Sequence, residues 1–577
     1  MPVYLNFRSE GGSLVMRSIR YVPILLAMTV SASCIAWGQG GGGRGRGNAA
    51  AAAQQAPPTS TQGAPAAQAG RGGRGGGAEA PNAGDFFNFD PNAASVQSIS
   101  ESSPAEAHQK IAINGETLAY TTRTGYMPLH NATTGQTEAH IFYTSYSKDG
   151  VSDASTRPML FFFGGAPGVS AAWQEFGGFG PKHMKWAGDG TAGDAPYAWT
   201  DNPGTLLGQA DLVFVNPVGT AFSRPDQPSH GAIFWNTAGD VASLAEFVRG
   251  YLVTAHRRNS PLFLAGEDFG TGRVAGLAAY LHEHDIPVRG VVLLSMTSTP
   301  DATAGDTQYL TLLPSLVMTA WYHKKLSPEL NAMSAEQISE RARQFASRPY
   351  LHALYKGERM TADERGKTVA DLARLIGVSK EFVANNDLRI TIERFNGELM
   401  REQHRGLSNS DSRVTGYLAN TGGRGFGGGG GGRGGFGVVP AVDFNESNRA
   451  GGFEVAYDDY LQRELGFKGN GIFYLSSGGI GTYTSTGNDD QSLSGAFARN
   501  PNMRLFVGVD YYDLKTPFYA TEYTLAHLNV APEVRAHNIM VSHFEAGQMA
   551  YVDNKALAKL QTELARFLTE AVAPAHK

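Results

Sequence analysis

The run SPLFLAGEDFGTGRVAGLAAYL, residues 260–281, decides the fold of this chain. Its first part, Pro261–Ala265, is a short apolar segment typical of a buried strand, and its last part has the composition of a helix. Between them lies GEDFG (266–270), with a glycine at each end. Such a turn between strand and helix predicts a nucleophile elbow, in which the central side chain is held out of the sheet and a Cβ at either glycine would clash. The residue expected at the centre is serine, and here it is Asp268.

Further apolar runs without alternation lie on both sides of the elbow, and helical patterns separate them. The runs are 159–163, 212–215, 262–265 and 291–294, and the helical patterns are 237–252 and 271–284. Strand, helix and strand in succession predict an α/β fold with a doubly wound, mostly parallel sheet.

The two ends of the globular region add strands to this sheet. Residues 110–113 and 116–124 predict a hairpin around Asn114-Gly115, and 140–146 alternates like another strand, which suggests an antiparallel entry to the sheet. Toward the C-terminus, strands are predicted at 471–475, 505–509 and 538–542, followed by an amphipathic helix at 555–571.

A helical cap is predicted between two strands of the sheet. Residues 300–420 are rich in charged residues and helix formers, and no convincing strand signal interrupts them. Such an insertion is most simply placed over the C-terminal ends of the strands, where α/β folds bind their ligands. The predicted organisation is therefore a first part of the core (95–299), the cap (300–420), a Gly/Arg-rich flexible loop (421–438) and a second part of the core (439–577).

The N-terminus has the features of an export signal, and the pattern fits best if the signal begins at Met16. Arg17 and Arg20 form a positive region, 21–32 an apolar region, and Ala36-Trp37-Gly38 a small-x-small cleavage site. We therefore expect a signal peptide at 1–38, a periplasmic or secreted protein, and no transmembrane span after cleavage, because the apolar run is too short to cross a bilayer comfortably.

Cys34 is the only cysteine of the chain. Lipoprotein anchoring at Cys34 is the less favoured alternative to cleavage after Gly38, because Ser31 stands where a large apolar residue is preferred. Cleavage after Gly38 would leave no cysteine, and therefore no disulfide. Residues 39–94, mostly Gly, Ala, Gln, Pro and Arg, predict a disordered tether.

The overall charge gives no drive toward nucleic acid. The formal net charge is -5 and the isoelectric point about 6.3, so we expect no nucleic-acid partner. The Arg-Gly repeats leave open another function, that of a surface interaction protein in which the Arg-Gly segments bind the partner. The sequence leaves the oligomeric state open.

Several motifs stand at the C-terminal ends of the predicted strands and occur in a fixed order. They are FFFGGAPGVSAAW (161–173), DLVFVNPVGTAFSRP (211–225), the elbow, VDYYDLKTP (509–517) and HFEAGQMAY (543–551). Together they resemble the serine carboxypeptidase family of the α/β-hydrolase fold, especially its bacterial members. The resemblance extends over roughly residues 95–575 and includes TAWYHKKL (319–326) and DSRVTG (411–416) in the cap.

The resemblance implies a substrate-binding loop at 164–168. The family has Asn-Gly-Gly-Pro-Gly there, and this chain has Gly-Gly-Ala-Pro-Gly. The family's Asn, which helps hold the substrate carboxylate, corresponds to Gly164. The Gly whose N–H contributes to the oxyanion hole corresponds to Ala166, which keeps the N–H if its backbone angles allow a Cβ.

The resemblance also implies the positions of a catalytic triad, two of which are substituted. The family's Gly-Glu-Ser-Tyr-Gly is GEDFG here, so Asp268 replaces the serine, Glu267 keeps the carboxylate-binding position and Phe269 keeps the N–H after the nucleophile. The triad aspartate corresponds to Asp513, whereas the position of the triad histidine is occupied by Gln548.

These substitutions remove the chemistry of a serine hydrolase. Asp268 has no hydroxyl, and the Gln548 amide can neither accept a proton near neutral pH nor return one. Loss of serine or histidine alone costs on the order of a millionfold in turnover, or roughly 8 kcal/mol of transition-state stabilisation. We therefore expect an inactive homologue that serves as a binding or scaffold protein, with a peptide or small-molecule ligand in the cleft and no cofactor.

Active alternatives remain open on the sequence alone. The chain could be a carboxypeptidase with a non-standard base, such as His543, which is expected inside the preceding strand. It could instead use Asp268 as the nucleophile, as haloalkane dehalogenases and epoxide hydrolases of this fold do. That mechanism needs a histidine to hydrolyse the ester, and Gln548 cannot replace it.

Each substituted residue also has a structural interpretation. Asp268 could simply stabilise a helix N-terminus, and Gln548 could bridge Asp268 and Asp513 with its amide hydrogens. Alternatively, Glu267, Asp268 and Asp513 could form an acidic pocket that binds an amine or a divalent ion weakly. No spacing in the sequence matches a recognised metal motif, and we predict no metal site.

Overall fold

The computed structural model describes residues 103–113, 115–165, 167–187, 191–417, 444–469, 471–476, 483–484 and 489–573, all within the compact unit Asn82–Lys577. The segments predicted to be a signal peptide (1–38), a tether (39–94) and a Gly/Arg-rich loop (421–438) lie outside the described residues.

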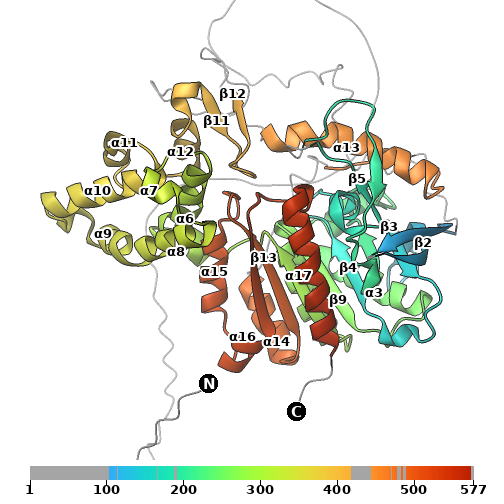
Figure 1. Cartoon of the computed structure of the whole chain (residues 1–577). Helices are drawn as coiled ribbons and strands as arrows, with labels where there is room; N and C mark the ends of the chain where they lie inside the picture. The colour runs from blue at the N-terminus through green and yellow to red at the C-terminus, as the bar shows by residue number, and fades with distance from the viewer. Residues whose placement is uncertain are drawn as a thin grey trace, which may run out of the picture. The chain divides into compact units, whose positions relative to one another are not determined.

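The described strands form one large mixed sheet (Figure 1). They are β1 (Ala105–Ile113), β2 (Glu116–His130), β3 (Thr137–Lys148), β4 (Met159–Phe163), β7 (Asp211–Val215), β8 (Arg224–Pro225), β9 (Leu262–Glu267), β10 (Val288–Leu294), β13 (Arg504–Asp510) and β14 (Ile539–Phe544). Their order is β1-β2-β3-β7-β4-β9-β10-β13-β14, with β8 paired to β3. From β1 to β7 neighbours run antiparallel, and from β7 to β14 they run parallel. The predicted doubly wound, mostly parallel α/β sheet is therefore confirmed.

The strand predictions agree with this sheet except at one place. The hairpin pairs Ile113 with Glu116, as a two-residue turn requires. The predicted strand at 471–475 is wrong, because Tyr474 and Ser476 make only isolated bridges, to Ala221 and Val169. Those partners follow β7 and β4, which already have a strand on each side, so no sheet edge is open to this segment.

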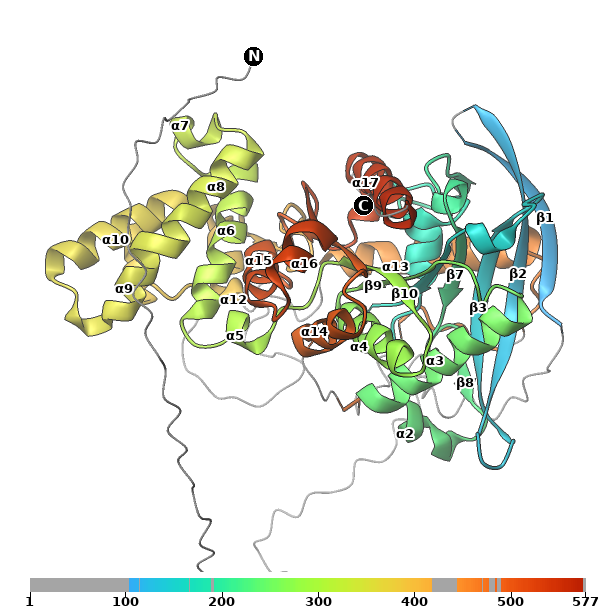
Figure 2. The ribbon, with the colours of Figure 1, turned by 90° about the horizontal axis from the view of Figure 1, so that it is seen from below.

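Alternate side chains of each parallel strand enter two separate cores, as the two-residue period of a strand requires. In β4, Phe161 and Phe163 join one core, whereas Leu160 and Phe162 join the other. Helices α3 (Thr237–Thr254), α4 (Phe269–Glu283) and α14 (Asp489–Arg499) cover the first face, and α13 (Phe444–Arg463) and α17 (Asn554–Val572) cover the second. Figure 2 shows α3, α4 and α14 on one side of the strands and α17 on the other.

The helical insertion lies between β10 and β13. Its helices are α5 (Pro300–Thr303), α6 (Thr307–Tyr322), α7 (Pro328–Asn331), α8 (Ala335–Phe345), α9 (Leu351–Lys356), α10 (Ala362–Ile376), α11 (Lys380–Asn385) and α12 (Ile392–Glu398). Local sequence starts two of them, because Ser334 with Gln337 and Thr361 with Glu364 form capping boxes. The expectation of no strand is wrong at β11 (Arg405–Leu407) and β12 (Thr415–Tyr417), which pair over three residues only, too short for an apolar pattern.

The cap is joined to the core by polar contacts on the β14 side of the sheet. Arg343 of α8 donates to both carboxylate oxygens of Glu522 on α15 (Phe518–His527), at 2.8 and 2.6 Å. His543 of β14 lies 2.6 Å from the same carboxylate. Thr319 of α6 shares a 2.7 Å hydrogen bond with Ser412, in the segment between β11 and β12. The Ser412 N–H in turn donates to the Tyr512 carbonyl (2.9 Å), just after β13, so this segment links α6 to the end of that strand.

Helix α13 is a structural feature that the sequence analysis does not predict. Its aromatic side chains stack against the second core, for example Phe453 on Trp173 with ring centroids 4.2 Å apart. Gly452 permits the close approach, since a Cβ there would lie 2.6 Å from Ala192 Cβ. Glycine is unfavourable inside a helix, so its presence weakens the helical signal in the sequence of this stretch.

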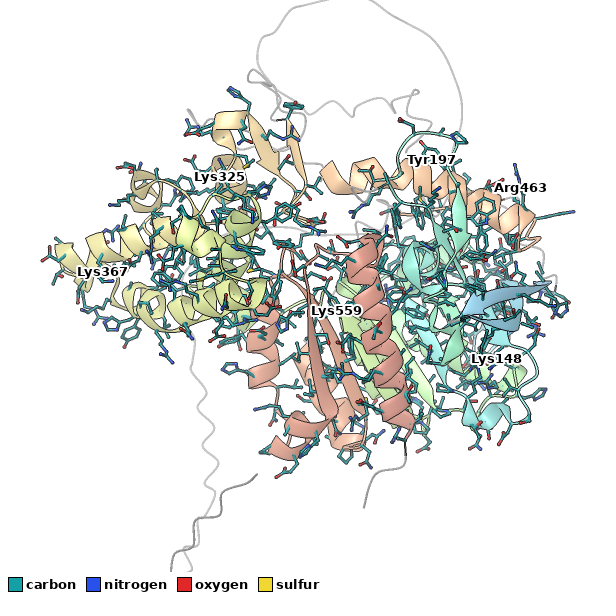
Figure 3. The ribbon with its side chains drawn as sticks, viewed as in Figure 1. Lys148, Tyr197, Lys325, Lys367, Arg463 and Lys559 are labelled. Atoms are coloured by element: carbon teal, nitrogen blue, oxygen red, sulfur yellow. The ribbon has the colours of Figure 1, made fainter. Side chains whose placement is uncertain are left out.

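The remaining elements connect the larger ones. They are α1 (Ala172–Gln174), α2 (Gly231–Phe234), α16 (Pro532–Asn538) and the small strand pair β5 (Lys182–Met184) and β6 (Trp199–Asp201). Figure 3 shows side chains filling the space between these layers, with Lys367 of α10 and Lys559 of α17 at their outer sides. None of the helices in the described residues is long and apolar enough to cross a bilayer.

Candidate functional site

The elbow has the strained geometry that the sequence predicts. Strand β9 ends at Glu267, α4 begins at Phe269, and Asp268 between them has φ 50° and ψ −126°, a conformation that L-residues rarely adopt. A Cβ at Gly266 would lie 2.2 Å from the Gly270 carbonyl oxygen. The turn therefore needs glycine at that position, as the motif implies.

The Asp268 side chain does not cap the helix that follows it. Asp268 occupies the N-cap position of α4, but its carboxylate accepts no hydrogen bond from the first turn. Its backbone is held instead, with its N–H donating to the Leu294 carbonyl (3.0 Å) and its carbonyl accepting from the Thr271 N–H (3.0 Å). The side-chain hydrogen bond of a helix cap is therefore not formed, and only a dipole interaction with the helix N-terminus is left of the structural interpretation.

The loop after β4 lies directly against the elbow. A Cβ placed on Gly165 would be 3.9 Å from Asp268 Cβ. Arg273 of α4 donates to the carbonyl oxygens of Gly164 (2.6 Å) and Gly165 (3.3 Å) and to Asp240 Oδ2 (2.7 Å). Arg273 thus fixes the loop to two helices. Ala166, the predicted oxyanion position, lies outside the described residues.

Phe269, the predicted second oxyanion position, begins α4 with a half-buried side chain. Its ring packs edge-on against Tyr483, with centroids 5.2 Å apart, and the Arg273 guanidinium carbon lies 5.7 Å from its centre. The aromatic ring therefore anchors the first turn of α4 beside the elbow.

Asp513 is buried in a turn after β13. One carboxylate oxygen accepts from the backbone N–H groups of Lys515 (2.8 Å) and Thr516 (3.1 Å), and the other from the Thr516 hydroxyl. Burial raises the pKa of Asp513 to about 7; the Thr516 hydrogen bonds oppose the shift, and the charge of Asp268 adds to it. Asp268 and Asp513 therefore lie close enough for their charges to interact.

Glu267 points into the protein beneath the elbow. Its side chain is 4% exposed, and Tyr551 donates to its Oε2 at 2.7 Å. Burial, and to a smaller extent the charges of Asp268 and Asp513, raise the pKa of Glu267 to about 8. The three acids of the predicted acidic pocket therefore do influence one another, and Glu267 is mostly protonated at neutral pH.

No group of three potential metal ligands occurs in the part of the chain that the structure describes. The divalent-ion form of the acidic-pocket hypothesis therefore gains no support. A single cationic group, such as an amine, needs no such cluster.

Gln548 lies on the loop after β14. Its backbone N–H donates to the Ser410 carbonyl (2.7 Å), which ties the loop to the segment between β11 and β12. Its side chain is 6% exposed and lines a cavity of about 10 Å³ with Trp173, Arg449 and Met549. Among the described contacts, Asp513 receives hydrogen bonds from Lys515 and Thr516 only, so the bridge from Gln548 to Asp513 is not formed.

His543 is engaged away from these residues. It lies within β14, as expected, and its Nε2 is 2.6 Å from Glu522 and 3.1 Å from Arg343. This position joins the cap to the core.

Comparison with known proteins identifies the family. Residues 113–392 match the family model of the serine carboxypeptidases. These residues belong to the serine carboxypeptidase family. No curated protein sequence matches the chain.

Solved structures of low identity share its fold. A prohormone-processing carboxypeptidase of Saccharomyces cerevisiae, Kex1Δp, has a TM-score of 0.50 at 12% identity over 78% of this chain and 91% of its own. The S. cerevisiae peroxisomal α/β-hydrolase Lpx1 (8% identity, 80% and 92% covered) and a bacterial heroin esterase (9%, 78% and 85%) have TM-scores of 0.31. At such identities the likeness to Kex1Δp shows the α/β-hydrolase fold alone.

Gly164, where the resemblance to the serine carboxypeptidases implies an Asn, leaves no room for a side chain. A Cβ at Gly164 would lie 2.2 Å from the Val169 carbonyl oxygen and 2.8 Å from the Ser170 carbonyl carbon. The loop thus folds back over the space that an Asn side chain would need. Restoring the family residue would require the backbone to move.

Gly164→Asn is therefore expected to destabilise the protein, by about 3 kcal/mol, the upper end of the usual cost of overpacking. Gly165→Ala is the matched control, because a Cβ there would meet Glu267 O at 3.6 Å, an ordinary contact. Urea denaturation of both variants measures the difference. If Gly164→Asn is as stable as Gly165→Ala, the loop does not exclude the family residue.

The structure adds residues that the sequence analysis does not single out. Asp510 lies at the end of β13 and Ser295 just after β10, both next to Glu267, and Arg449 of α13 lies next to Gln548. The position of Asp510 at the C-terminal end of a predicted strand was a signal that could have found it. Arg449 had no such signal, because α13 itself is not predicted.

Proposed function

We propose that this chain binds a ligand at the elbow without hydrolysing it. The observation that carries the proposal is the elbow itself, which keeps its strained backbone while presenting the carboxylate-bearing Asp268. Strain of this kind persists only where the surrounding structure maintains it, and it is typical of functional sites. Because a serine mechanism needs a hydroxyl and a base, the retained geometry supports binding better than catalysis.

The surroundings of Asp513 support the same proposal. Its described hydrogen bonds come from Lys515 and Thr516, and its raised pKa leaves it partly protonated near pH 7. His543, the histidine closest in sequence to Gln548, is engaged by Glu522 and Arg343. An ester formed on Asp268 would therefore lack a base to activate water, which argues against an aspartate-nucleophile enzyme.

The charge of the site favours a ligand with a cationic group. Burial, and to a smaller extent the charge of Asp268, raise the pKa of Glu267 and Asp513, so Glu267 is mostly and Asp513 partly protonated at neutral pH. An amine next to Asp268 would relieve this repulsion. We propose a peptide or small molecule with an amino group as the ligand. We also propose that the protein is exported, since residues 1–38 have the pattern of a signal peptide.

Thermal unfolding with a panel of free dipeptides, N-blocked dipeptides and polyamines tests the proposal. A ligand at a hundred times its Kd stabilises the folded state by about 2.7 kcal/mol, so free amines should raise Tm and their N-blocked counterparts should not. Gly165→Leu is the control, because a Cβ at Gly165 would make ordinary contacts with Glu267 O (3.6 Å) and Asp268 Cβ (3.9 Å), and a larger side chain there is expected to obstruct the space beside Asp268. Equal stabilisation of Gly165→Leu would show that the ligand binds elsewhere.

A further inference from the structure

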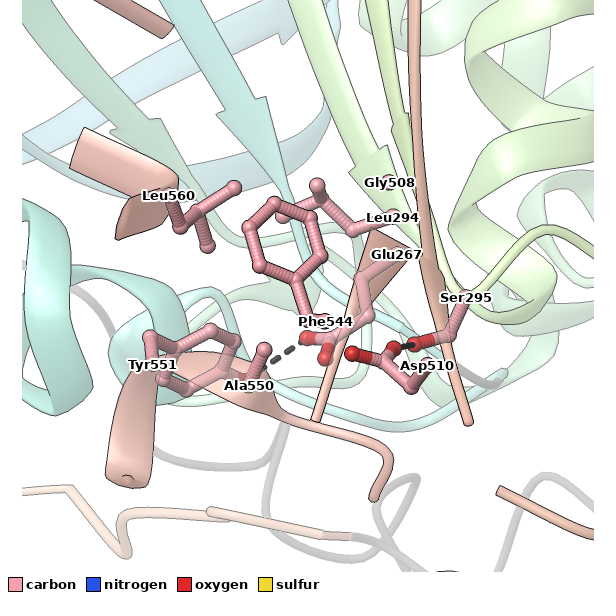
Figure 4. Close-up of a pocket in the computed structure, with 9 residues that line it drawn as sticks. All are labelled: Glu267, Leu294, Ser295, Gly508, Asp510, Phe544, Ala550, Tyr551 and Leu560. Carbon is pink, nitrogen blue, oxygen red and sulfur yellow. Dashed lines mark hydrogen bonds between the residues drawn. The ribbon is translucent and has the colours of Figure 1, made fainter. Parts of the chain in front are cut away.

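Two buried carboxyl groups meet beneath the elbow. Glu267 ends β9 and Asp510 ends β13, and their side chains are 4% and 3% exposed. Figure 4 shows the two carboxyl groups side by side, between Tyr551 on one flank and Ser295 on the other. Both line one cavity with apolar walls that include Leu294, Phe544 and Leu560.

Each carboxyl group has one oxygen with a partner and one without. Tyr551 donates to Glu267 Oε2 at 2.7 Å, and Ser295 donates to Asp510 Oδ2 at 2.8 Å. Glu267 Oε1 and Asp510 Oδ1 are buried and have no hydrogen-bond partner. The Met549 N–H lies near Glu267 and favours its charged form, but it does not satisfy Oε1. A buried carboxylate oxygen left without a partner is costly.

The cavity offers little room for a third group to satisfy these oxygens. Its volume is about 10 Å³, at the lower limit of what one water molecule needs. A proton on one carboxyl group needs no additional volume. An O–H on either acid can donate to the facing oxygen of the other, and both unpartnered atoms are then satisfied at once.

We propose that Glu267 and Asp510 share one proton and act as a single acid pair. The proton resides on Glu267 Oε1 or Asp510 Oδ1 and is donated to the other, so the pair carries one negative charge instead of two. The Tyr551 and Ser295 hydroxyl groups donate to the outer oxygens. The pair thus forms a continuous chain of hydrogen bonds from Tyr551 to Ser295.

The charges around the pair retain this proton. Asp268 and Asp513 face Glu267, while Asp513 and Asp411 face Asp510, and all of them disfavour a second negative charge. On the other flank, the positive charge of Arg449 lies near the Tyr551 hydroxyl. Burial is the largest cause of the raised pKa of both acids. The acidic neighbours and burial therefore act in the same direction.

The hydrogen-bond chain links the structural parts that position the site. It joins the end of β9, immediately before Asp268, to β13, to Ser295 after β10 and to Tyr551, three residues after Gln548. Ser295 has φ 46° and is also held by its N–H to the Gly508 carbonyl (3.0 Å). Loss of the shared proton would break the middle of this chain. The acid pair is therefore a pH-sensitive brace under the elbow.

The sign of the pH effect follows from the pKa of Glu267, which rises from its ordinary 4.5 to about 8. The folded state holds this proton more tightly than the unfolded state, so the stabilisation is complete below pH 4.5 and is lost as the pH rises to about 8. One such proton changes the folding equilibrium constant up to tenfold per pH unit within that window.

The test compares the full chain with Glu267→Gln, Asp510→Asn and the double variant. Either amide can donate to the remaining carboxylate and still accept from Tyr551 or Ser295, so both single variants should fold. Infrared spectra at pH 7 are expected to lose the same protonated-carboxyl band in either single variant. Between pH 5 and 8, the ratio of each variant's folding equilibrium constant to that of the unaltered chain should rise by up to tenfold per pH unit.

Glu175→Gln is the matched control. Glu175 is also buried with a pKa raised to about 7, but its two oxygens accept from Tyr146 and Tyr457. That variant should lose a separate band and leave the band of the pair in place. If Glu267→Gln and Asp510→Asn each removed a different part of the protonated-carboxyl absorbance, so that the two losses added up, the two acids would be independent. No loss in either would show that both groups are ionised. Each of these results would overturn the shared proton.

Discussion

The unaltered chain is expected to hydrolyse N-blocked dipeptides and simple esters no faster than the uncatalysed background, on the order of a millionfold more slowly than a complete triad. Asp268 supplies no hydroxyl, and Gln548 supplies no base. The described partners of Asp513 offer no replacement, because Lys515 and Thr516 donate to its carboxylate. The missing transition-state stabilisation amounts to roughly 8 kcal/mol.

Three variants sharpen this expectation. Asp268→Ser and Gln548→His should each remain inactive alone, because nucleophile and base act as a unit. The double variant should gain ester turnover, since Asp513 can accept a further hydrogen bond from an imidazole. Its peptidase activity should stay low, because the loop at Gly164 leaves no space for the family's asparagine. Turnover by the unaltered chain at ordinary peptidase rates would contradict the prediction that the chain is inactive.

Arg273→Met is expected to cost about 3 to 5 kcal/mol of stability, the usual effect of breaking a buried ion pair. The Arg273 and Asp240 side chains are only 2% and 5% exposed, and the loss of Arg273 leaves Asp240 without its cation. The same change removes the donor that holds the carbonyl oxygens of Gly164 and Gly165. The loop beside Asp268 should therefore loosen as well.

Arg249→Met is the matched control for this prediction. Arg249 pairs with Glu246 on the exposed side of α3, where both side chains are more than two-fifths exposed. Exposed pairs contribute about 0 to 1 kcal/mol. Denaturant unfolding of the two variants should differ by several-fold in the loss of stability. Equal, small losses would show that Arg273 does not hold the loop.

The sequence predicts the elbow and the parallel strands well because their signals are local. GEDFG carries its own glycines, and a Cβ at Gly266 would collide with a residue only four positions away. The runs at 159–163 and 212–215 are apolar throughout because both of their faces are covered. Each of these patterns can be recognised without knowing what packs against it.

The features that the sequence misses depend on contacts between distant segments. Glu267 and Asp510 are separated by more than two hundred residues and meet only because β9 and β13 flank the same strand, β10. The segment 471–475 has a strand-like composition but finds no open sheet edge. At Gly164, the sequence alone indicates that a side chain is missing. The structure shows in addition that the backbone of the same loop occupies the space a side chain would need.

Labelling with a fluorophosphonate measures whether the elbow still carries a nucleophile. After treatment of the full chain, mass spectrometry of the intact protein and its peptides should find no adduct on the unaltered chain. The variant that combines Asp268→Ser with Gln548→His should carry one adduct per molecule, at position 268. A stoichiometric adduct on any serine or threonine of the unaltered chain would show that the chain keeps an active nucleophile.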